Sequence, residues 1–535
     1  MTRRVPILVT LALLLLAMPA LAQNTGSADF TRYVALGDSL TAGFTSGSLY
    51  GPVQQVSYPA QIFDVVNGTF AGFEQPIVSS PGIPAIQQLQ SLVPTVVGSV
   101  GGSGQPTNLF LQRPYDNLAV PGATVSDVLR TVSDGGLHDV VLRGLGTQLQ
   151  QAQSLQPTFA TLWIGNNDVL GAAISGLVIE GITVTPVAQF EADYRQIVGG
   201  LGAVGAQLAL GTIPDVTIIP YVTTIAPVLV DPNTNQPILV NGQTVPLIGP
   251  NGPLVPGQDF VLLVEGPRQL ANGRGIPVAL GGTGQPLTDE AVLTSNEVAF
   301  LRDRVAAYNN IIRTIAGEAG AAVAETGAIL GEINAEGLDL GGITFTTEFL
   351  TGGLFSYDGV HPTPLGYAIS GDIFIEAIND HYGADIPLIN LGPFVYGSLG
   401  SLGTGVTFGA GMPRTTPRAD RNLYASLGLP DRPTLRQLAS ASSDDGGGDP
   451  PPPPPPNPGG ESNDDGDDGA IDPPPPPPPP PSVCSVLPGH PDYCALCGPC
   501  GIGEGGCAPN TCGPGLTCSE VPGPMANDRL VCLPN

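Results

Sequence analysis

The chain has 535 residues, which is enough for more than one domain and for a large buried core. All 18 of its basic residues are arginine, and with 46 acidic residues its formal net charge is -28. This balance argues against nucleic acid or an anionic membrane as a partner, because both require a basic protein face. The 73 glycines and 58 prolines predict abundant turns and irregular segments.

The N-terminus has the pattern of a secretory signal peptide over residues 1–22. Arg3 and Arg4 precede the apolar run VPILVTLALLLLAM, and Ala20-Leu21-Ala22 forms a small-residue cleavage site. We therefore expect cleavage near Ala22 and a secreted protein, extracellular or periplasmic; an uncleaved N-terminal anchor is the alternative. No later apolar run is long enough to span a bilayer, so no transmembrane anchor is expected after cleavage.

Residues 23–412 have the pattern of an α/β domain. Short apolar runs that each end in a turn-forming cluster predict strands buried on both faces of a parallel sheet. These runs are RYVALGD, TFATLWIGN, AQLALGTIPD and AGAAVAETGAI. The clearest helix is expected to start near Thr294, where TSNE fits a capping box. Its apolar stripe, interpreted as core, is formed by Val298, Leu301, Val305, Tyr308, Ile312 and Ile315.

Residues 221–290 interrupt this α/β pattern. Short β-type runs alternate there with Asn-Gly and Pro-Asn turn signals, which indicates hairpins. We interpret the segment as a β-hairpin-rich insertion on the α/β core, either a lid or substrate-binding wall or a solvent-facing ornament. Its Leu, Val and Pro content hints at an apolar cover, and so at a lipid or long-chain ester as substrate.

Two further segments follow the main domain. Residues 413–482 are interpreted as a disordered linker, because from about Ser442 the composition collapses into Asp, Gly and two proline runs that favour stiff polyproline spacers. Residues 483–535 are expected to form a small disulfide-rich module, since an even number of cysteines in an exported chain predicts a disulfide framework. The eight cysteines are Cys484, Cys494, Cys497, Cys500, Cys507, Cys512, Cys518 and Cys532.

The connectivity of the four expected disulfides is open. Cys494, Cys497 and Cys500 form C-x-x-C-x-x-C, which also occurs in metal sites. An iron–sulfur run, however, would continue with a closely spaced fourth cysteine followed by proline, whereas Cys507 is followed by alanine. We therefore expect no metal.

The stretch YVALGDSLTAG raises the question whether Ser39 is a nucleophile or a helix cap. A serine hydroxyl becomes a good nucleophile only beside a base, and that base must be oriented by a third group. Of the four histidines, His361 stands apart: it follows Asp358 by three residues, on a loop that leads into an apolar helix. Taken alone, this loop is more simply a solvated turn with a capping aspartate.

Two other stretches supply candidate groups for the same chemistry. YDNLAVPGATVSDV contains Asn117 and then Gly122, whose lack of a side chain lets its N–H approach a ligand closely. LWIGNNDVL ends a buried-looking strand with Gly165-Asn166-Asn167-Asp168, where a side-chain amide can enter a cleft at the carboxyl edge of the sheet. Separately, each is more simply an ordinary turn, and Trp163 is more simply core.

Together, these stretches resemble the blocks of the GDSL/SGNH hydrolase family: an early GDS, a glycine block, GxND and a late DxxH. The resemblance spans roughly residues 30–385 and implies a flavodoxin-like three-layer α/β/α sandwich with a mostly parallel central sheet. It implies Ser39 as nucleophile, His361 as general base and then acid, and Asp358 as the residue that orients it. The oxyanion hole would consist of the Ser39 N–H, the Gly122 N–H and the Asn167 side-chain amide.

The resemblance further implies a secreted serine ester hydrolase, an esterase or lipase that works through an acyl-enzyme and needs no cofactor. Its substrate would be a small-molecule or lipid ester. An acyltransferase or a carbohydrate deacetylase on the same fold is an alternative. The other alternative is an extracellular binding or adhesion protein whose cysteine-rich module contacts a surface or polymer.

Overall fold

The computed structural model describes residues 24–92, 95–231, 234 and 236–395, together with the backbone of the short strands β17 (Arg414–Thr415), β18 (Leu516–Val521) and β19 (Arg529–Pro534). The expected signal peptide, six of the eight cysteines and, apart from β17, the expected linker lie outside the described residues. Contacts within the chain define two units, Met1–Asp449 and Pro450–Asn535.

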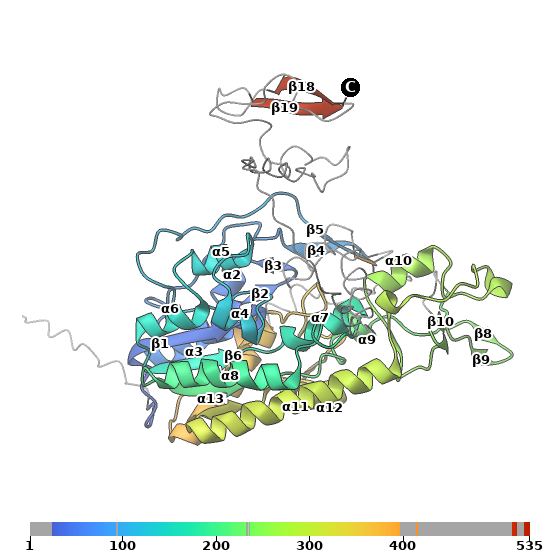
Figure 1. The fold of residues 1–535 in the computed structure, drawn as a ribbon. Helices are drawn as coiled ribbons and strands as arrows, with labels where there is room; N and C mark the ends of the chain where they lie inside the picture. Colours follow the sequence, from blue (N-terminus) through green and yellow to red (C-terminus); the bar gives the residue numbers. More distant parts are fainter. Residues whose placement is uncertain are drawn as a thin grey trace, which may run out of the picture. The chain divides into compact units, whose positions relative to one another are not determined.

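The first unit is organised around a parallel sheet in the order β1-β6-β7-β14, of which Figure 1 labels β1 and β6. The strands are β1 (Tyr33–Gly37), β6 (Phe159–Trp163), β7 (Gln207–Gly211) and β14 (Ala322–Ala324). All four apolar runs expected to form strands do so, because each run is buried on both faces as the sequence pattern requires. Along the free edge of β1, Asn117 forms a parallel bridge with Ala35.

Helices cover both faces of this sheet. Tyr33 and Ala35 of β1 pack in one apolar cluster with α3 and α13, while Val34 and Leu36 pack in another with the helices of the opposite face. The helices of the first face are α3 (Tyr58–Asn67) and α13 (Pro364–Tyr382). Those of the second are α4 (Val125–Arg130), α6 (Gln148–Leu155), α8 (Val187–Gly202) and α11 (Ser295–Ala319). The result is a mixed α/β fold with a central parallel sheet between two helical layers.

The helix expected near Thr294 is α11, and the structure confirms it. The Thr294 side chain and the Glu297 carboxylate form the expected capping box, which satisfies backbone N–H groups of the first turn. All six residues of the expected apolar stripe are buried. The sequence predicts this helix well because both the cap and the apolar stripe depend only on residues of the helix itself and its N-cap.

The remaining elements are short and mostly connect or extend the layers. The helices are α1 (Ser39–Ala42), α2 (Gly51–Gln54), α5 (Leu137–Leu142), α7 (Asn167–Ser175), α9 (Pro220–Thr223), α10 (Glu265–Ala271) and α12 (Thr326–Glu336). The 3₁₀ turns are η1 (Phe30–Arg32), η2 (Val278–Leu280) and η3 (Asp289–Ala291). The strands outside the insertion are β2 (Phe44–Thr45), β3 (Ser48–Leu49), β4 (Gln87–Leu92), β5 (Thr95–Ser99), β15 (Leu338–Leu340) and β16 (Ile343–Phe345).

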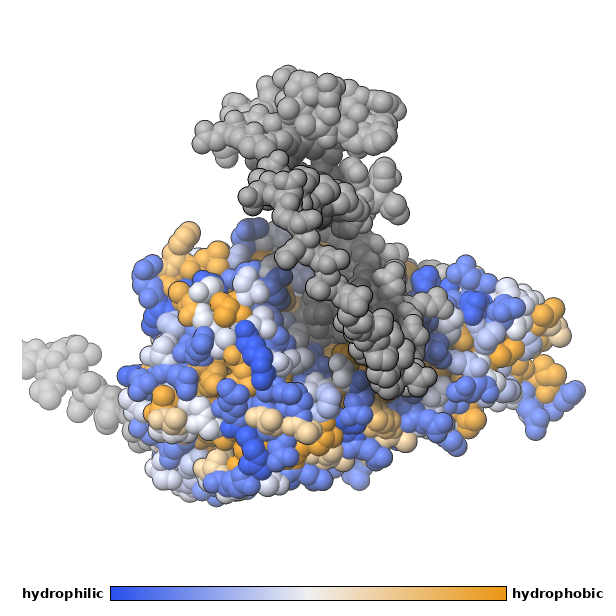
Figure 2. Space-filling view, viewed as in Figure 1, coloured by the Kyte–Doolittle hydropathy of each residue, from blue (hydrophilic) through white to orange (hydrophobic). Residues whose placement is uncertain are grey.

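The segment 221–290 contains the expected hairpins. They are β8 (Leu239–Val240) with β9 (Gln243–Thr244), and β10 (Ile248–Gly249) with β11 (Gly252–Pro253). A third antiparallel pair joins β12 (Phe260–Val261) to β13 (Val292–Leu293), and helix α10, which the turn signals did not predict, lies between them. Apolar side chains are exposed at the end that carries β8 and β9 (Figure 2).

In the second unit, β18 and β19 form an antiparallel hairpin in which the Cα atoms of Cys518 and Cys532 are directly paired. The disulfides themselves stay predictions. Among the residues that the structure describes, no helix is both long enough and apolar enough to cross a membrane.

Candidate active site

The candidate residues gather where the parallel strands end. Gly37, the last residue of β1, pairs in register with Trp163, the last residue of β6, so the loops that follow the two strands start side by side. A Cβ on Gly37 would lie only 2.4 Å from the Trp163 carbonyl oxygen, so this close approach requires glycine. The carboxyl edge of a parallel sheet is where open α/β folds form their clefts.

Ser39 is the first residue of α1, and the helix cap is its neighbour Asp38. The buried Asp38 carboxylate accepts the Leu40 N–H (3.0 Å) and the Asn166 side-chain amide (2.8 Å). Burial raises the pKa of Asp38 to about 6, although these hydrogen bonds act in the opposite direction. Because Asp38 caps the helix, the Ser39 hydroxyl is left free of that task.

Asp358 and His361 form a buried hydrogen-bonded pair. Asp358 Oδ2 lies 2.8 Å from His361 Nδ1, and both side chains are 0% exposed. The same carboxylate accepts the backbone N–H groups of Val360 (2.9 Å) and His361 (2.8 Å) through Oδ1. The three-residue spacing therefore closes a tight turn in which the carboxylate fixes both the loop and the imidazole.

A second segment completes the surroundings of Asp358. The Gly47 N–H, from the turn between β2 and β3, donates to Asp358 Oδ2 (2.7 Å), and the Ser356 hydroxyl donates to Oδ1 (3.2 Å). Burial alone would raise the pKa of Asp358, but the His361 charge and the hydrogen bonds from His361 and Val360 outweigh it and hold the pKa below its ordinary value. The lowered pKa favours an ionised carboxylate although the side chain is buried.

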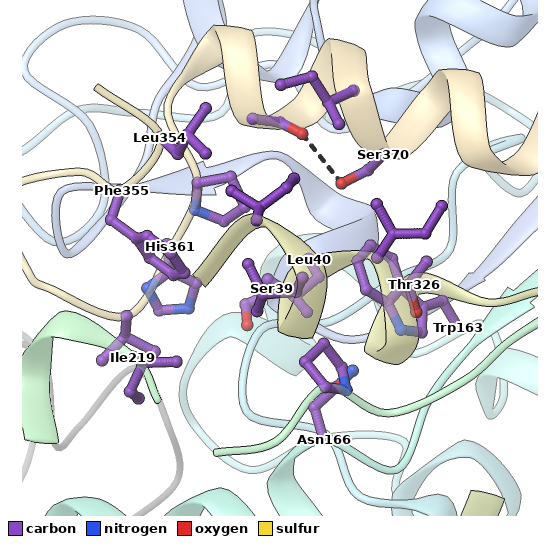
Figure 3. A pocket seen from close by; sticks show the side chains of 18 of the residues that line it. Ser39, Leu40, Trp163, Asn166, Ile219, Thr326, Leu354, Phe355, His361 and Ser370 are labelled. Atoms are coloured by element: carbon purple, nitrogen blue, oxygen red, sulfur yellow. Dashed lines mark hydrogen bonds between the residues drawn. The ribbon is translucent and has the colours of Figure 1, made fainter. Parts of the chain in front are cut away.

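Ser39 and His361 line the same pocket (Figure 3). An imidazole nitrogen faces the side of the pocket on which the Ser39 hydroxyl lies. With Nδ1 held by Asp358, Nε2 is buried and has no hydrogen-bond partner among the described residues. A free Nε2 beside a serine is the arrangement in which an imidazole can accept the hydroxyl proton.

The two candidate oxyanion donors from other loops lie next to each other. Gly122 adopts a φ of +87°, which side-chain-bearing residues rarely adopt, and the Asn167 amide donates to the carbonyl of the adjacent Ala123 (2.9 Å). Asp168 ties the same loops together, because it accepts the Val125 N–H (3.0 Å) and the Thr185 hydroxyl (2.7 Å). Burial raises the pKa of Asp168 to about 7.

The structure also shows residues that the sequence patterns did not single out. Asn166 lines the pocket, whereas Asn167 is not among the lining residues, and Asn166 is tied to Asp38. Ser356 and Gly47 hold Asp358, and no local signal marks them, since serine and glycine are common in turns. Trp163 is buried at 3% exposure, as expected of core, yet it also forms part of the pocket wall.

The insertion does not form the apolar cover suggested by its composition. No described residue of 221–290 lines the pocket; its apolar wall includes residues of α12, of α13, of the loop after β7 and of the loop before α13. The base of the insertion instead supports the loop of Asp358 and His361, because the Tyr221 N–H donates to the Gly359 carbonyl (2.9 Å).

The other described histidines are engaged elsewhere. His138 Nδ1 binds Asp134 (2.7 Å), and His381 Nε2 binds the Gly320 carbonyl (2.9 Å). Neither lines the pocket. The part of the chain that the structure describes contains no group of three or more His, Cys, Asp or Glu side chains arranged to hold a metal ion.

Replacing Asn167 with alanine is expected to lower kcat for ester hydrolysis roughly 10²–10³-fold with a small change in KM, because an oxyanion donor acts mainly in the transition state. Asn166→Ala is the matched comparison, since its amide binds Asp38. Steady-state kinetics on one ester check both variants. An unchanged kcat in Asn167→Ala, with a large loss in Asn166→Ala, would assign the oxyanion amide to Asn166.

Comparisons with known proteins bear on this site. The family model described as GDSL-like Lipase/Acylhydrolase matches residues 33–374, a range that contains Ser39, Gly122, Asn167, Asp358 and His361. A comparison with curated proteins gives no match for this chain.

Several solved structures are similar to parts of this one. One is a catalytic mutant of Axe2, an acetylxylan esterase from Geobacillus stearothermophilus, with 13% identity and a TM-score of 0.30 over 66% of this chain and 94% of that chain. Another is TesA, with 11% identity and a TM-score of 0.26 over 65% and 98%. A third is LAE5, an alpha/beta hydrolase from the metagenome of Lake Arreo, Spain, with 12% identity and a TM-score of 0.29 over 65% and 94%.

The family match extends over more than half of the chain and contains all four strands of the parallel sheet. The chain belongs to the family of GDSL-like lipases and acylhydrolases, and it is a hydrolase of ester bonds.

Proposed function

We propose that the protein is a secreted serine hydrolase that cleaves carboxylic esters through an acyl-enzyme on Ser39. His361 acts as general base and then as general acid, and Asp358 orients it. One observation carries the proposal: in the buried Asp358–His361 pair, the second imidazole nitrogen has no hydrogen-bond partner among the described residues, and His361 lines the same pocket as Ser39. Secretion is supported by the basic, apolar and small-residue pattern of residues 1–22.

We infer the following reaction for these groups. Ser39 Oγ attacks the ester carbonyl carbon while its proton passes to His361 Nε2, and the N–H groups of Ser39 and Gly122 with the Asn167 amide receive the developing oxyanion. Collapse breaks the bond to the alcohol oxygen, which takes the proton from His361. Water then attacks the acyl-enzyme by the same route and releases the carboxylic acid. Asp358 remains ionised throughout and stabilises the imidazolium.

The proposal is tested with the purified protein and p-nitrophenyl acetate or butanoate. We expect release of p-nitrophenol that stops when a fluorophosphonate forms a covalent bond to Ser39, located by mass spectrometry of the peptides. Hydrolysis that persists after full labelling, or labelling of another serine, would contradict Ser39 as the nucleophile.

A further inference from the structure

The pocket next to Ser39 is apolar beyond the catalytic groups. Helix α12 contributes Ile329, Leu330 and Ile333 to its wall, and helix α13 contributes Ile369 and Ile373. These side chains come from segments far apart in the chain, so only the packing of α12 against α13 creates a continuous hydrocarbon surface.

The polar groups in this wall are already engaged within the protein. The Ser370 hydroxyl donates to the Gly366 carbonyl (2.9 Å; Figure 3), and the Thr326 hydroxyl donates to the Thr212 carbonyl. The indole N–H of Trp163 also donates to Thr212 (3.0 Å). Apart from Ser39, Asn166 and His361, the described wall therefore has no polar side chain left to bind a ligand, and a sugar or charged group placed there would lose its hydrogen bonds to water without replacement.

Helix α12 is held by a small core of its own. Ile333 is 7% exposed and packs with Phe345, Leu354, Leu365 and Val395, a cluster distinct from the two that cover the sheet. Ile329 and Leu330 are only half-buried although they line the pocket, whereas Ala328 of the same helix is exposed and does not line it. The helix thus presents two incompletely covered apolar side chains to the pocket.

We infer that this pocket binds the hydrocarbon chain of a fatty acyl group, and that Ile329 and Leu330 of α12 set the length of chain it accepts. The inference rests on the proposed function, because the acyl carbon is the atom bonded to Ser39 Oγ in the acyl-enzyme. The acyl chain stays in place through both steps, whereas the alcohol takes a proton from His361 and leaves. Burying each additional methylene is expected to raise kcat/KM about fourfold, the equivalent of about 0.8 kcal/mol, until the pocket is full.

The kinetic test uses the p-nitrophenyl esters of acetate, butanoate, octanoate and dodecanoate. We expect octanoate to have a higher kcat/KM than acetate in the wild type. Leu330→Trp should lower the value for octanoate at least about tenfold and leave acetate within about twofold, because added volume blocks only a chain that reaches α12. Ala328→Trp adds the same side chain to the exposed face of the helix and should leave the whole profile unchanged.

Two results would overturn the inference. One is a profile in which acetate is the best substrate or in which Leu330→Trp slows all esters equally. The other appears in a comparison of octyl acetate with ethyl octanoate: if octyl acetate is preferred, and only its hydrolysis is lowered by Leu330→Trp, the pocket binds the alcohol.

A binding experiment separates this inference from the proposed function. Trp163 is the only tryptophan in the chain and lines the pocket, so its fluorescence reports occupancy. In the Ser39→Ala protein, which should not turn over esters, 8-bromooctanoate is expected to quench this fluorescence saturably and bromoacetate is not. Absent quenching contradicts the acyl pocket, whereas absent hydrolysis of every ester by the wild type contradicts the proposed function.

Discussion

Replacing Ser39 with alanine is expected to lower kcat for p-nitrophenyl ester hydrolysis roughly 10⁵-fold, because the reaction then loses its nucleophile and keeps only the oxyanion donors and substrate binding. KM should change little, since the hydroxyl is small and the apolar walls of the pocket are intact. Initial rates, corrected with blanks that contain no active enzyme, measure the loss.

The loss must be separated from unfolding. Ser39 is 3% exposed, and alanine removes one buried oxygen without adding volume, so circular dichroism and the melting temperature should stay close to wild type. Ser126→Ala on α4, where the hydroxyl accepts a hydrogen bond from the exposed Arg130, is a matched control that should keep full activity. If Ser39→Ala retained even a tenth of the wild-type rate, another group would have to be the nucleophile.

Asp358→Asn is expected to lower kcat about 10⁴-fold, because an amide in place of the carboxylate favours the wrong imidazole tautomer and no longer stabilises the imidazolium. The isosteric amide also meets the Gly47, Val360 and His361 N–H groups less well than a carboxylate does, since one of its two positions is a donor. A moderate fall in the melting temperature should accompany the loss of activity. Steady-state kinetics and thermal unfolding check the two effects, and Asp303→Asn on the exposed face of α11 is the control.

The pH dependence of the melting temperature is a second measurement of the role of Asp358. Because the pKa of Asp358 lies below its ordinary value, its carboxylate contributes stability above that ordinary value, and the contribution is lost only as pH falls through the lowered pKa. Any loss of wild-type activity between about pH 7 and pH 5 must therefore come from a group other than Asp358. The melting-temperature difference between wild type and Asp358→Asn should not shrink over that range and should shrink only under stronger acid. A difference that already shrinks near pH 6 would contradict the ionised state assigned to Asp358.

Much of the fold was predictable because its signals are local. A strand buried on both faces must be apolar over several consecutive residues, so β1, β6, β7 and β14 are visible as short runs. A helix such as α11 carries its cap and its apolar stripe within its own length. The candidate residues could be found for the same reason: each follows a strand or precedes a helix, and the order of the blocks resembles a known family.

The surroundings of those residues were decided by tertiary structure. Asp358 receives the Gly47 N–H from a turn 311 residues away, and nothing in either segment specifies the other. The apolar character of residues 221–290 pointed to the insertion as the cover of the pocket, whereas the apolar wall includes α12 and α13 and no described residue of that segment.

The physical reason is the same in each case. Composition and periodicity report which side chains must leave water. They therefore determine the strands and helices, and also the strand and helix ends at which the reactive groups lie. They do not report which buried surface meets which, because that depends on the packing of segments remote in the chain. The residues of the candidate site follow from the sequence; the ionisation of Asp358, the unpartnered His361 nitrogen and the apolar pocket beside Ser39 follow only from the folded arrangement.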